Sequence, residues 1–168
     1  MIHFEYMDKA LFADDAEAIF LLLAAAMGEI APTGNSYQDD YRSWRGAIDE
    51  ELRDDNRKIV LIYAENALIG FFQYSIKGDV FWMEQIAIDQ GYRGKDQIFR
   101  RLYQFLCADL RGIETVEAHA GKLNAKSQGI LARLGLQVIG ENRNGLSYHF
   151  RGGYDGFLDW LGTEGAGD

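Results

Sequence analysis

Two basic side chains follow a short apolar stretch in the middle of the chain, and this segment has the residue types of an anion-binding turn. Residues 86–88 read Ile-Ala-Ile, and Arg93 and Lys95 follow on either side of Gly94. A helical pattern then begins near Ile98. Backbone N–H groups at the start of a helix, together with the helix dipole, favour an anion there. The segment therefore predicts a phosphate or pyrophosphate cradle, although it has neither the Walker spacing nor the dinucleotide-binding glycine fingerprint.

A second stretch that could bind a ligand follows the next predicted strand. Residues 124–136 read Asn-Ala-Lys-Ser-Gln-Gly-Ile-Leu-Ala-Arg-Leu-Gly-Leu. Asn124, at the exit of a strand, can bond exposed backbone or a ligand amide. Gly135 is typical of a helix end.

Three side chains are candidates for proton transfer. Glu84 is the only charged residue in the apolar segment 80–88, and a partly desolvated carboxylate suits proton abstraction from an ammonium group. Its alternative role is to pair with an arginine or to face water. His119 can act as a base or be a hydrogen-bonded structural residue, and Tyr148 can act as an acid or be structural. Cys107 is predicted to pack in a helix rather than to act as a nucleophile.

The periodicity of the apolar residues predicts the elements that position these side chains. Asp14 or Asp15 is the expected cap of the first helix, Asn144-Gly145 is a hairpin signal, and residues 28–36 form a loop. The order of elements indicates a mixed α/β sheet of about six to seven strands flanked by about four helices, with one parallel, right-handed crossover. The strands are expected at residues 2–6, 59–63, 67–76, 80–88, 115–120, 137–140 and 146–150, and the helices at 14–27, 38–54, 94–110 and 125–134.

Length and composition are typical of one soluble domain. The chain has 168 residues, and its single cysteine excludes an internal disulfide and any cysteine-rich zinc site, so no metal site is predicted. The net charge of −9 opposes non-specific binding of nucleic acid and is compatible with a cationic ligand. The longest apolar run, residues 18–27, is too short to span a membrane and is not a signal peptide, so we expect a cytoplasmic protein without membrane contact.

The C-terminal residues are expected to form a tail, 152–168, beyond a domain of residues 1–151. Gly152-Gly153 predicts a break, and the last residues are expected to be loose. The segment 154–161 carries more large apolar side chains than it can bury by itself, so it docks on the sheet or on a second subunit, and we favour a homodimer contact. Those side chains are Tyr154, Phe157, Leu158, Trp160 and Leu161.

Taken together, the two binding stretches resemble the GNAT superfamily of N-acetyltransferases. Tyr-Arg-Gly-Lys at residues 92–95 is similar to the family's coenzyme-binding motif. Residues 124–136 are similar to a second motif, with Ser127 at its alanine position and Leu136 at its phenylalanine position. The order of elements is similar over roughly residues 1–151. The resemblance implies a splayed sheet, acetyl-CoA as co-substrate, and direct attack on the thioester by a primary amine of a small molecule or peptide.

The resemblance also assigns residues to the coenzyme. The pantetheine arm is expected to lie along the backbone of residues 86–88, and the pyrophosphate on the turn that follows. The residues so assigned are Ile86, Ala87, Ile88, Arg93, Gly94, Lys95, Asp96, Gln97 and Ile98, with Asn124 and Ser127 on the other side of the coenzyme.

The sequence departs from the family pattern in two places. Asp96 stands where the family has a glycine, and Ile98 stands where it has a second small residue. Small residues let the backbone approach the phosphates closely, so their replacement predicts weaker coenzyme binding. Leu131 stands where many members have a tyrosine that protonates the leaving thiolate, which leaves Tyr148 as a substitute. The alternatives to an N-acetyltransferase are therefore a catalytically inactive GNAT-like binding or regulatory domain, and an enzyme that uses another acyl donor.

Overall fold

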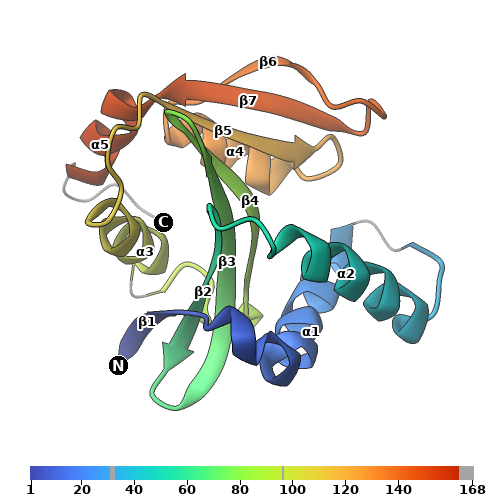
Figure 1. The fold of residues 1–168 in the computed structure, drawn as a ribbon. Helices are drawn as coiled ribbons and strands as arrows, with labels where there is room; N and C mark the ends of the chain where they lie inside the picture. Colours follow the sequence, from blue (N-terminus) through green and yellow to red (C-terminus); the bar gives the residue numbers. More distant parts are fainter. Residues whose placement is uncertain (31–32, 96, 163–168) are drawn as a thin grey trace. The chain divides into compact units, whose positions relative to one another are not determined.

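A computed structural model describes residues 1–30, 33–95 and 97–162 of the chain, without the side chains of residues 27–30. The chain forms a seven-stranded mixed sheet in the order β1-β2-β3-β4-β5-β7-β6, with helices around it (Figure 1). This confirms the predicted α/β fold class. The strands are β1 (Ile2–Tyr6), β2 (Arg57–Ala64), β3 (Ala67–Lys77), β4 (Val80–Ile88), β5 (Thr115–Gly121), β6 (Gln137–Glu141) and β7 (Ser147–Gly153). The α-helices are α1 (Phe12–Ile30), α2 (Tyr37–Glu51), α3 (Ile98–Cys107), α4 (Ala125–Arg133) and α5 (Tyr154–Gly162), and the short 3-10 turns are η1 (Lys9–Leu11) and η2 (Gln90–Tyr92).

The pairing of β4 with β5 confirms the predicted parallel crossover. Their register runs from Val80 opposite Thr115 to Met83 opposite Ala118. The strands β5 and β7 pair antiparallel along their whole length, and β1 pairs antiparallel with residues 60–64 of β2. Strand β6 pairs antiparallel with β7, with an irregularity near Val138. The hairpin predicted around Asn144-Gly145 therefore supplies the last two strands of the sheet.

The first helix begins earlier than predicted. It starts at Phe12, directly after η1, so Asp14 and Asp15 lie in its first turn and are not its cap. The side chain of Asp8 accepts the N–H of Ala10 at 3.0 Å and caps η1 instead. The helix runs to Ile30, into the segment predicted as a loop.

The helix α3 is shorter than predicted, because left-handed residues precede it. Gly94 has φ +71° and Gln97 has φ +51°, and an α-helix of L-residues cannot continue through such a conformation. Asp96 lies outside the described residues. The helix therefore starts at Ile98 rather than at Gly94, and Gly94 and Lys95 follow η2 outside the helix.

The predicted break at Gly152-Gly153 was wrong. Strand β7 continues through both glycines, which pair with Val116 and Thr115 of β5, and α5 follows directly. Glycine is found within a strand where hydrogen-bonded pairing holds its backbone and where another part of the backbone approaches it closely. At Gly152 the neighbour is the carbonyl oxygen of Gly135, which a Cβ would meet at 2.8 Å.

The described chain divides into two compact units, and both β3 and β4 contribute residues to each. The first consists of Met1–Tyr74 and Gln85–Arg93, the second of Ser75–Glu84 and the residues from Gly94 onward. In the first unit, α1 and α2 lie side by side (Figure 1). The core between these helices and the strands contains Met7, Phe12, Ala16, Ile19, Ile48, Leu52, Ile59, Leu61, Phe71 and Ala87.

In the second unit, α5 packs against α3. Phe157 is fully buried and contacts the rings of Phe81 and Tyr103, with centroid distances of 6.2 and 5.1 Å. The buried guanidinium of Arg100 donates to the carbonyl oxygens of Trp160 and Leu161, at 3.1 and 2.7 Å. These bonds satisfy carbonyls at the C-terminal end of α5, which lack partners within the helix. The apolar segment 154–161 thus docks within its own chain.

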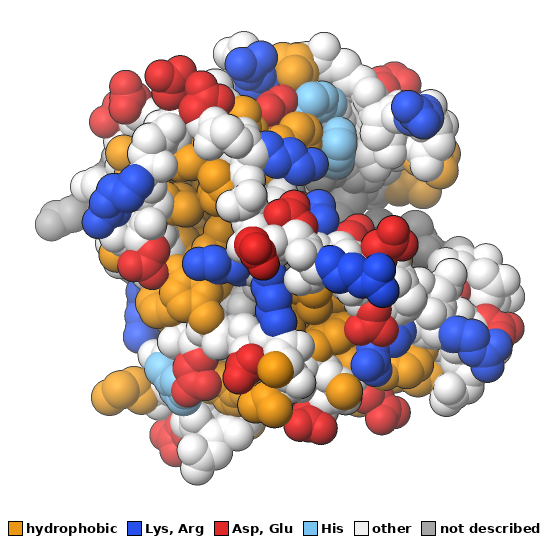
Figure 2. Space-filling view, in the orientation of Figure 1, with side chains coloured by type: hydrophobic (Ala, Val, Ile, Leu, Met, Phe, Trp, Pro, Cys, Tyr) orange, Lys and Arg blue, Asp and Glu red, His pale blue; other side chains and the backbone are white. Residues whose placement is uncertain are grey.

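Three properties of the described residues bear on function. None of the helices in this part of the chain is long and apolar enough to cross a membrane. On the face shown in Figure 2, acidic and basic side chains are interspersed rather than gathered by sign. Over the same described residues, no group of three or more His, Cys, Asp or Glu side chains could hold a metal ion.

Candidate active site

The end of β4 carries the first predicted coenzyme contacts. The backbone N–H of Asp89 donates to the carbonyl oxygen of Ile69 at 2.7 Å, and its side chain accepts the N–H of Gly91 at 2.8 Å. The Nε of Arg93 donates to the carbonyl oxygen of Ile88 at 2.9 Å. Arg93 therefore turns back to the strand end, and the predicted contacts Ile88 and Arg93 lie together.

A cavity of about 410 Å³ lies beside this strand end, within the first unit. Its volume falls within the range usual for small-molecule sites, roughly 300–1,000 Å³. One wall is apolar and comes from α1, and the polar groups come from the strand end and η2. The lining residues are Ala18, Leu21, Leu22, Ala25, Leu68, Ile88, Asp89, Gln90 and Arg93. The contribution of α1 to the cavity wall was not predicted from the sequence, although the broad apolar face of that helix could have indicated it.

The turn before α3 has exposed residues on either side of Asp96 and a buried residue at the start of the helix. Ile98 is 2% exposed, so its side chain packs in the core, and its N–H points to the carbonyl oxygen of Lys95 at 3.3 Å. Gln97 begins α3 without a side-chain cap. Lys95, Gly94 and Gln97 are exposed, and any contact of Ile98 with a coenzyme would be made by its backbone.

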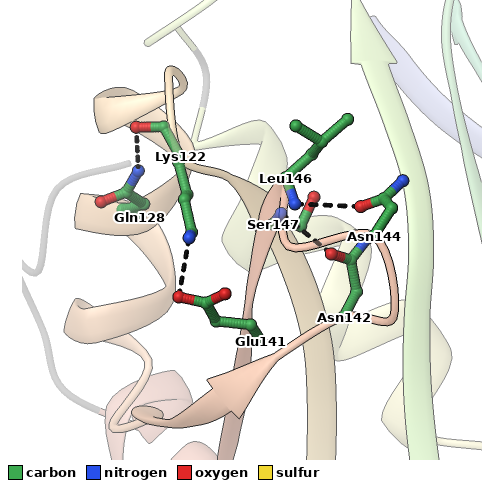
Figure 3. Close-up of polar contacts among 7 residues, drawn as sticks. All are labelled: Lys122, Gln128, Glu141, Asn142, Asn144, Leu146 and Ser147. Atoms are coloured by element: carbon green, nitrogen blue, oxygen red, sulfur yellow. Dashed lines mark hydrogen bonds and ion pairs between the residues drawn. The ribbon is translucent and has the colours of Figure 1, made fainter.

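Asn124 and Ser127 lie together at the start of α4. The Oδ1 of Asn124 accepts the N–H of Ser127 at 3.1 Å and caps the helix. Gln128 closes the loop after β5 by donating to the carbonyl oxygens of Gly121 and Lys122, at 2.9 and 3.1 Å; the second bond is drawn in Figure 3. The asparagine therefore has a structural role at the helix start.

Tyr148 is half-buried on β7 and packs against a lysine. The Nζ of Lys122 lies 5.3 Å from the centre of the Tyr148 ring and 2.7 Å from Oε1 of Glu141. The turn that precedes β7 is held by Asn142, whose Oδ1 accepts the N–H of Ser147, and by Asn144, whose Oδ1 accepts the N–H of Leu146 (Figure 3). These contacts fix the Tyr148 ring beside a cation.

A cluster that sequence reasoning largely missed lies on β4, β5 and β7 in the second unit. Trp82, Glu117, His119 and His149 are neighbours there, and only His119 was predicted as a site residue. Burial and the neighbouring His149 lower the pKa of His119. Glu84 is partly buried two residues after Trp82 on β4. Glu117 and His119 are two residues apart on β5, so their side chains lie on the same face of the sheet. This spacing could have indicated the cluster if β7 had been known to pair with β5.

Cys107 does not take part in any of these groups. It lies near the end of α3, and burial raises the pKa of its thiol, which keeps it protonated. This supports the prediction that Cys107 is a packing residue.

The sheet order and the β4–turn–α3 segment define the class of protein. The chain matches the sequence model of the Acetyltransferase (GNAT) family over residues 7–136, a range that includes both predicted binding stretches. It therefore belongs to the GNAT family of acyl-CoA-dependent acetyltransferases, with acetyl-CoA as co-substrate. No curated protein matches the chain by sequence.

Solved structures share the fold at low sequence identity. An acetyltransferase from Thermus thermophilus has a TM-score of 0.70 at 14% identity, over 91% of this chain and 97% of that chain. The PaiA N-acetyltransferase from Thermoplasma acidophilum, in complex with coenzyme A, has a TM-score of 0.68 at 12% identity, over 92% and 99%. Spermidine N-acetyltransferase from Vibrio cholerae, in complex with CoA and spermine, has a TM-score of 0.64 at 14% identity, over 94% and 98%.

Proposed function

We propose that this protein transfers the acetyl group of acetyl-CoA to a primary amine of a small molecule or peptide, by direct attack in a ternary complex. The observation that carries the proposal is the family match over residues 7–136, which takes in the turn after β4 and the start of α4. The amine lone pair attacks the thioester carbonyl carbon, the C–S bond breaks, and coenzyme A leaves as a thiolate. No acyl-enzyme forms, so Cys107 has no part in the reaction.

The coenzyme site that we propose follows the predicted contacts. Backbone at Ile86, Ala87 and Ile88 receives the pantetheine arm, and the turn from Arg93 to Ile98 receives the pyrophosphate. The exposed backbone and Lys95 supply donors and charge suited to an anion. The cavity at Ile88 and Arg93 supports this placement, because its apolar wall and polar end suit an amphipathic chain.

The acceptor is proposed to be an amine that is cationic before reaction. A relative with the same fold, spermidine N-acetyltransferase, has been solved with spermine. The net charge of −9 favours the approach of a cation. Action in the cytoplasm is part of the same proposal and comes from the sequence. The homodimer contact expected from segment 154–161 is not part of it, because that segment packs against α3 of its own chain.

One observation favours the alternative of a domain that no longer binds the coenzyme. Gln97 adopts a left-handed conformation that is uncommon for a residue with a side chain, and Ile98 fills the core where the family has a small residue. The exposed side chain of Gln97 restricts how closely a phosphate can approach the backbone at this position.

Titration calorimetry with acetyl-CoA tests the coenzyme part of the proposal, with coenzyme A and dephosphorylated pantetheine as comparisons. We expect micromolar binding that weakens when the phosphates are removed. Thiol release is then measured with spermidine, free amino acids and a lysine peptide as acceptors. Absence of heat and of a melting shift at millimolar acetyl-CoA would instead support the non-catalytic alternative.

The substitution Asp96→Gly further separates the proposed acetyltransferase from the alternative of a domain that no longer binds the coenzyme. Hydrogen bonds to charged groups contribute about 1.5–3 kcal/mol each, so one added backbone contact should strengthen acetyl-CoA binding about tenfold or more. Asp96→Asn is the matched control that removes only the charge. Ile98→Ala is not suitable, because its side chain is buried and truncation would cost about 2–5 kcal/mol of stability. Binding only in the glycine variant would mean that the natural chain does not use the coenzyme.

A further inference from the structure

The helix α1 has a second apolar face besides the one that packs in the core. Phe12, Ala16 and Ile19 of this helix belong to the buried core of the first unit. A surface helix normally has one such apolar stripe, and its other side chains are polar. The second face has the helical spacing of three, four and seven residues and lines the cavity beside the end of β4. Its residues are Ala18, Leu21, Leu22 and Ala25.

This second face is open to solvent, although packing within the first unit does not require it to be apolar. Leu21 is 55% exposed, and Ala18 and Ala25, about one turn before and after it, are also exposed. Leu22 and, from the start of β3, Leu68 are partly buried and continue the apolar wall. An apolar ligand group placed against this wall would remove its surface from water, which is favourable.

The polar side chains of the cavity carry no net charge. They are the carboxylate of Asp89, the amide of Gln90 and the guanidinium of Arg93. Asp89 accepts the N–H of Gly91, and Arg93 donates to the carbonyl oxygen of Ile88, so both are held at the strand end. A phosphate inside this cavity would be repelled by the Asp89 carboxylate. The lining therefore favours a neutral ligand group that has an apolar side and hydrogen-bonding functions.

Acetyl-CoA has a group of this kind between its pyrophosphate and the rest of its pantetheine arm. This pantoyl group is uncharged and has two methyl groups on one carbon, a hydroxyl and an amide. Ile88 belongs to the strand segment proposed to receive the pantetheine arm, and Arg93 begins the turn proposed to receive the pyrophosphate. The cavity includes both residues and thus lies where the two parts of the coenzyme join. All of its lining residues belong to the first unit.

We propose that α1 binds the pantoyl group of acetyl-CoA in this cavity. The two methyl groups lie against Leu21 and Ala25, and the hydroxyl and amide face Asp89 and Gln90. The assignment rests on the proposed acetyl transfer. It adds α1 to a coenzyme site that was predicted only from β4, the turn after it and the start of α4. It also explains the second apolar face of α1, because the bound coenzyme covers that face.

A comparison of two ligands tests the contact with Leu21. The ligands are acetyl-CoA and an analogue of it that lacks the two pantoyl methyl groups. Each buried methyl group contributes about fourfold to affinity, so Leu21→Ala should weaken acetyl-CoA binding about tenfold in titration calorimetry. The same substitution should change the affinity for the analogue far less, because the effects of removing two groups in contact are not additive. The melting temperature should stay near that of the wild type, since Leu21 is exposed.

A second variant tests whether the coenzyme occupies the cavity. In Ala25→Phe the new ring takes the space that the pantoyl group needs, so the affinity for acetyl-CoA should fall about tenfold or more. The matched controls are Leu11→Ala, at a leucine of η1 that is 52% exposed, and Ala13→Phe, at an exposed alanine in the first turn of α1. Neither residue is part of the cavity lining, so both controls should bind acetyl-CoA as the wild type does.

The outcomes separate this assignment from the proposed function. If Leu21→Ala weakened the binding of acetyl-CoA and of the analogue equally, the leucine would contact another part of the coenzyme and the pantoyl assignment would be wrong. Wild-type affinity for acetyl-CoA in Leu21→Ala or in Ala25→Phe would also overturn it. Acetyl transfer would remain in place in each of these cases. A wild type that binds no acetyl-CoA at millimolar concentration would overturn the proposed function itself.

Discussion

Glu84 and Glu117 lie on neighbouring strands, and only Glu84 was predicted to matter. Glu84 is the single charge in an apolar strand, which makes it conspicuous in the sequence. Glu117 alternates with His119 on β5, a pattern typical of a solvent-facing strand surface. Its burial and its imidazole partner come from β7, 32 residues away in the chain. At the residue scale, the burial of Glu117 and its contact with His149 could therefore not be predicted from its own segment.

Glu84→Gln tests the role of the predicted carboxylate. We expect kcat/KM for an alkyl amine to fall about tenfold or more, because a charge-assisted hydrogen bond contributes about 1.5–3 kcal/mol. Acetyl-CoA affinity and the melting temperature should stay close to those of the wild type. Glu50→Gln, at an exposed glutamate of α2, is the control. Unchanged kcat/KM would remove Glu84 from the mechanism.

At the element scale, β7 depends on a close backbone contact at one of its glycines. A Cβ at Gly152 would meet the carbonyl oxygen of Gly135 at 2.8 Å and the Cα of Leu136 at 3.2 Å. Both are backbone atoms, which cannot move aside as a flexible side chain can. The contact joins the end of β7 to the chain that leaves α4, so it is part of how the second unit packs.

Gly152→Ala should destabilise the protein, and Gly153→Ala should not. Overpacking of this kind costs about 1–3 kcal/mol. Gly153 is the matched control, since a Cβ there meets nothing within 4 Å and its φ is not positive. Urea unfolding of both variants measures the difference. Equal stabilities would show that the backbone near Gly135 shifts without cost.

At the scale of the whole molecule, the chain passes repeatedly between its two units. The strands β3 and β4 each supply residues to both, so neither unit consists of one continuous segment. Each unit is assembled from segments that are separated in the chain. If one unit folded while the chain between its segments stayed disordered, closing that loop would cost a large amount of entropy. We therefore expect the chain to unfold in one cooperative transition.

Phe157→Ala tests this cooperativity from the far end of the chain. Truncation of a fully buried phenylalanine costs about 3–5 kcal/mol. Hydrogen exchange should then become faster in β2 of the first unit as well as in α5 and β5. Leu158→Ala, one residue along the same helix and 38% exposed, should change little. Two separate transitions, or faster exchange confined to the second unit, would contradict the expectation.

Much of the fold could be predicted because its elements have clear local periodicity. Six of the seven strands were predicted close to their observed bounds, and so was the turn at Asn144-Gly145. Strand β7 runs to Gly153 rather than to residue 150, and α2 ends at Glu51 rather than at residue 54. The boundaries of α1 and α3 were less accurate. Those boundaries depend on capping by Asp8 and on the left-handed Gln97, which apolar spacing does not show. The helix α5 was missed as a helix, because Gly152-Gly153 reads as a break until pairing with β5 is known.

The sequence by itself determined the family, the α/β class and the segments expected to bind acetyl-CoA, because these follow from short motifs and their order. Only the tertiary structure decided that Ile98 points into the core, that α5 docks on α3, and that Glu117 meets His149. These outcomes depend on which side of a strand or helix faces a partner distant in the chain. Strand register sets that choice, and a shift of one residue would move every side chain of β7 to the opposite face.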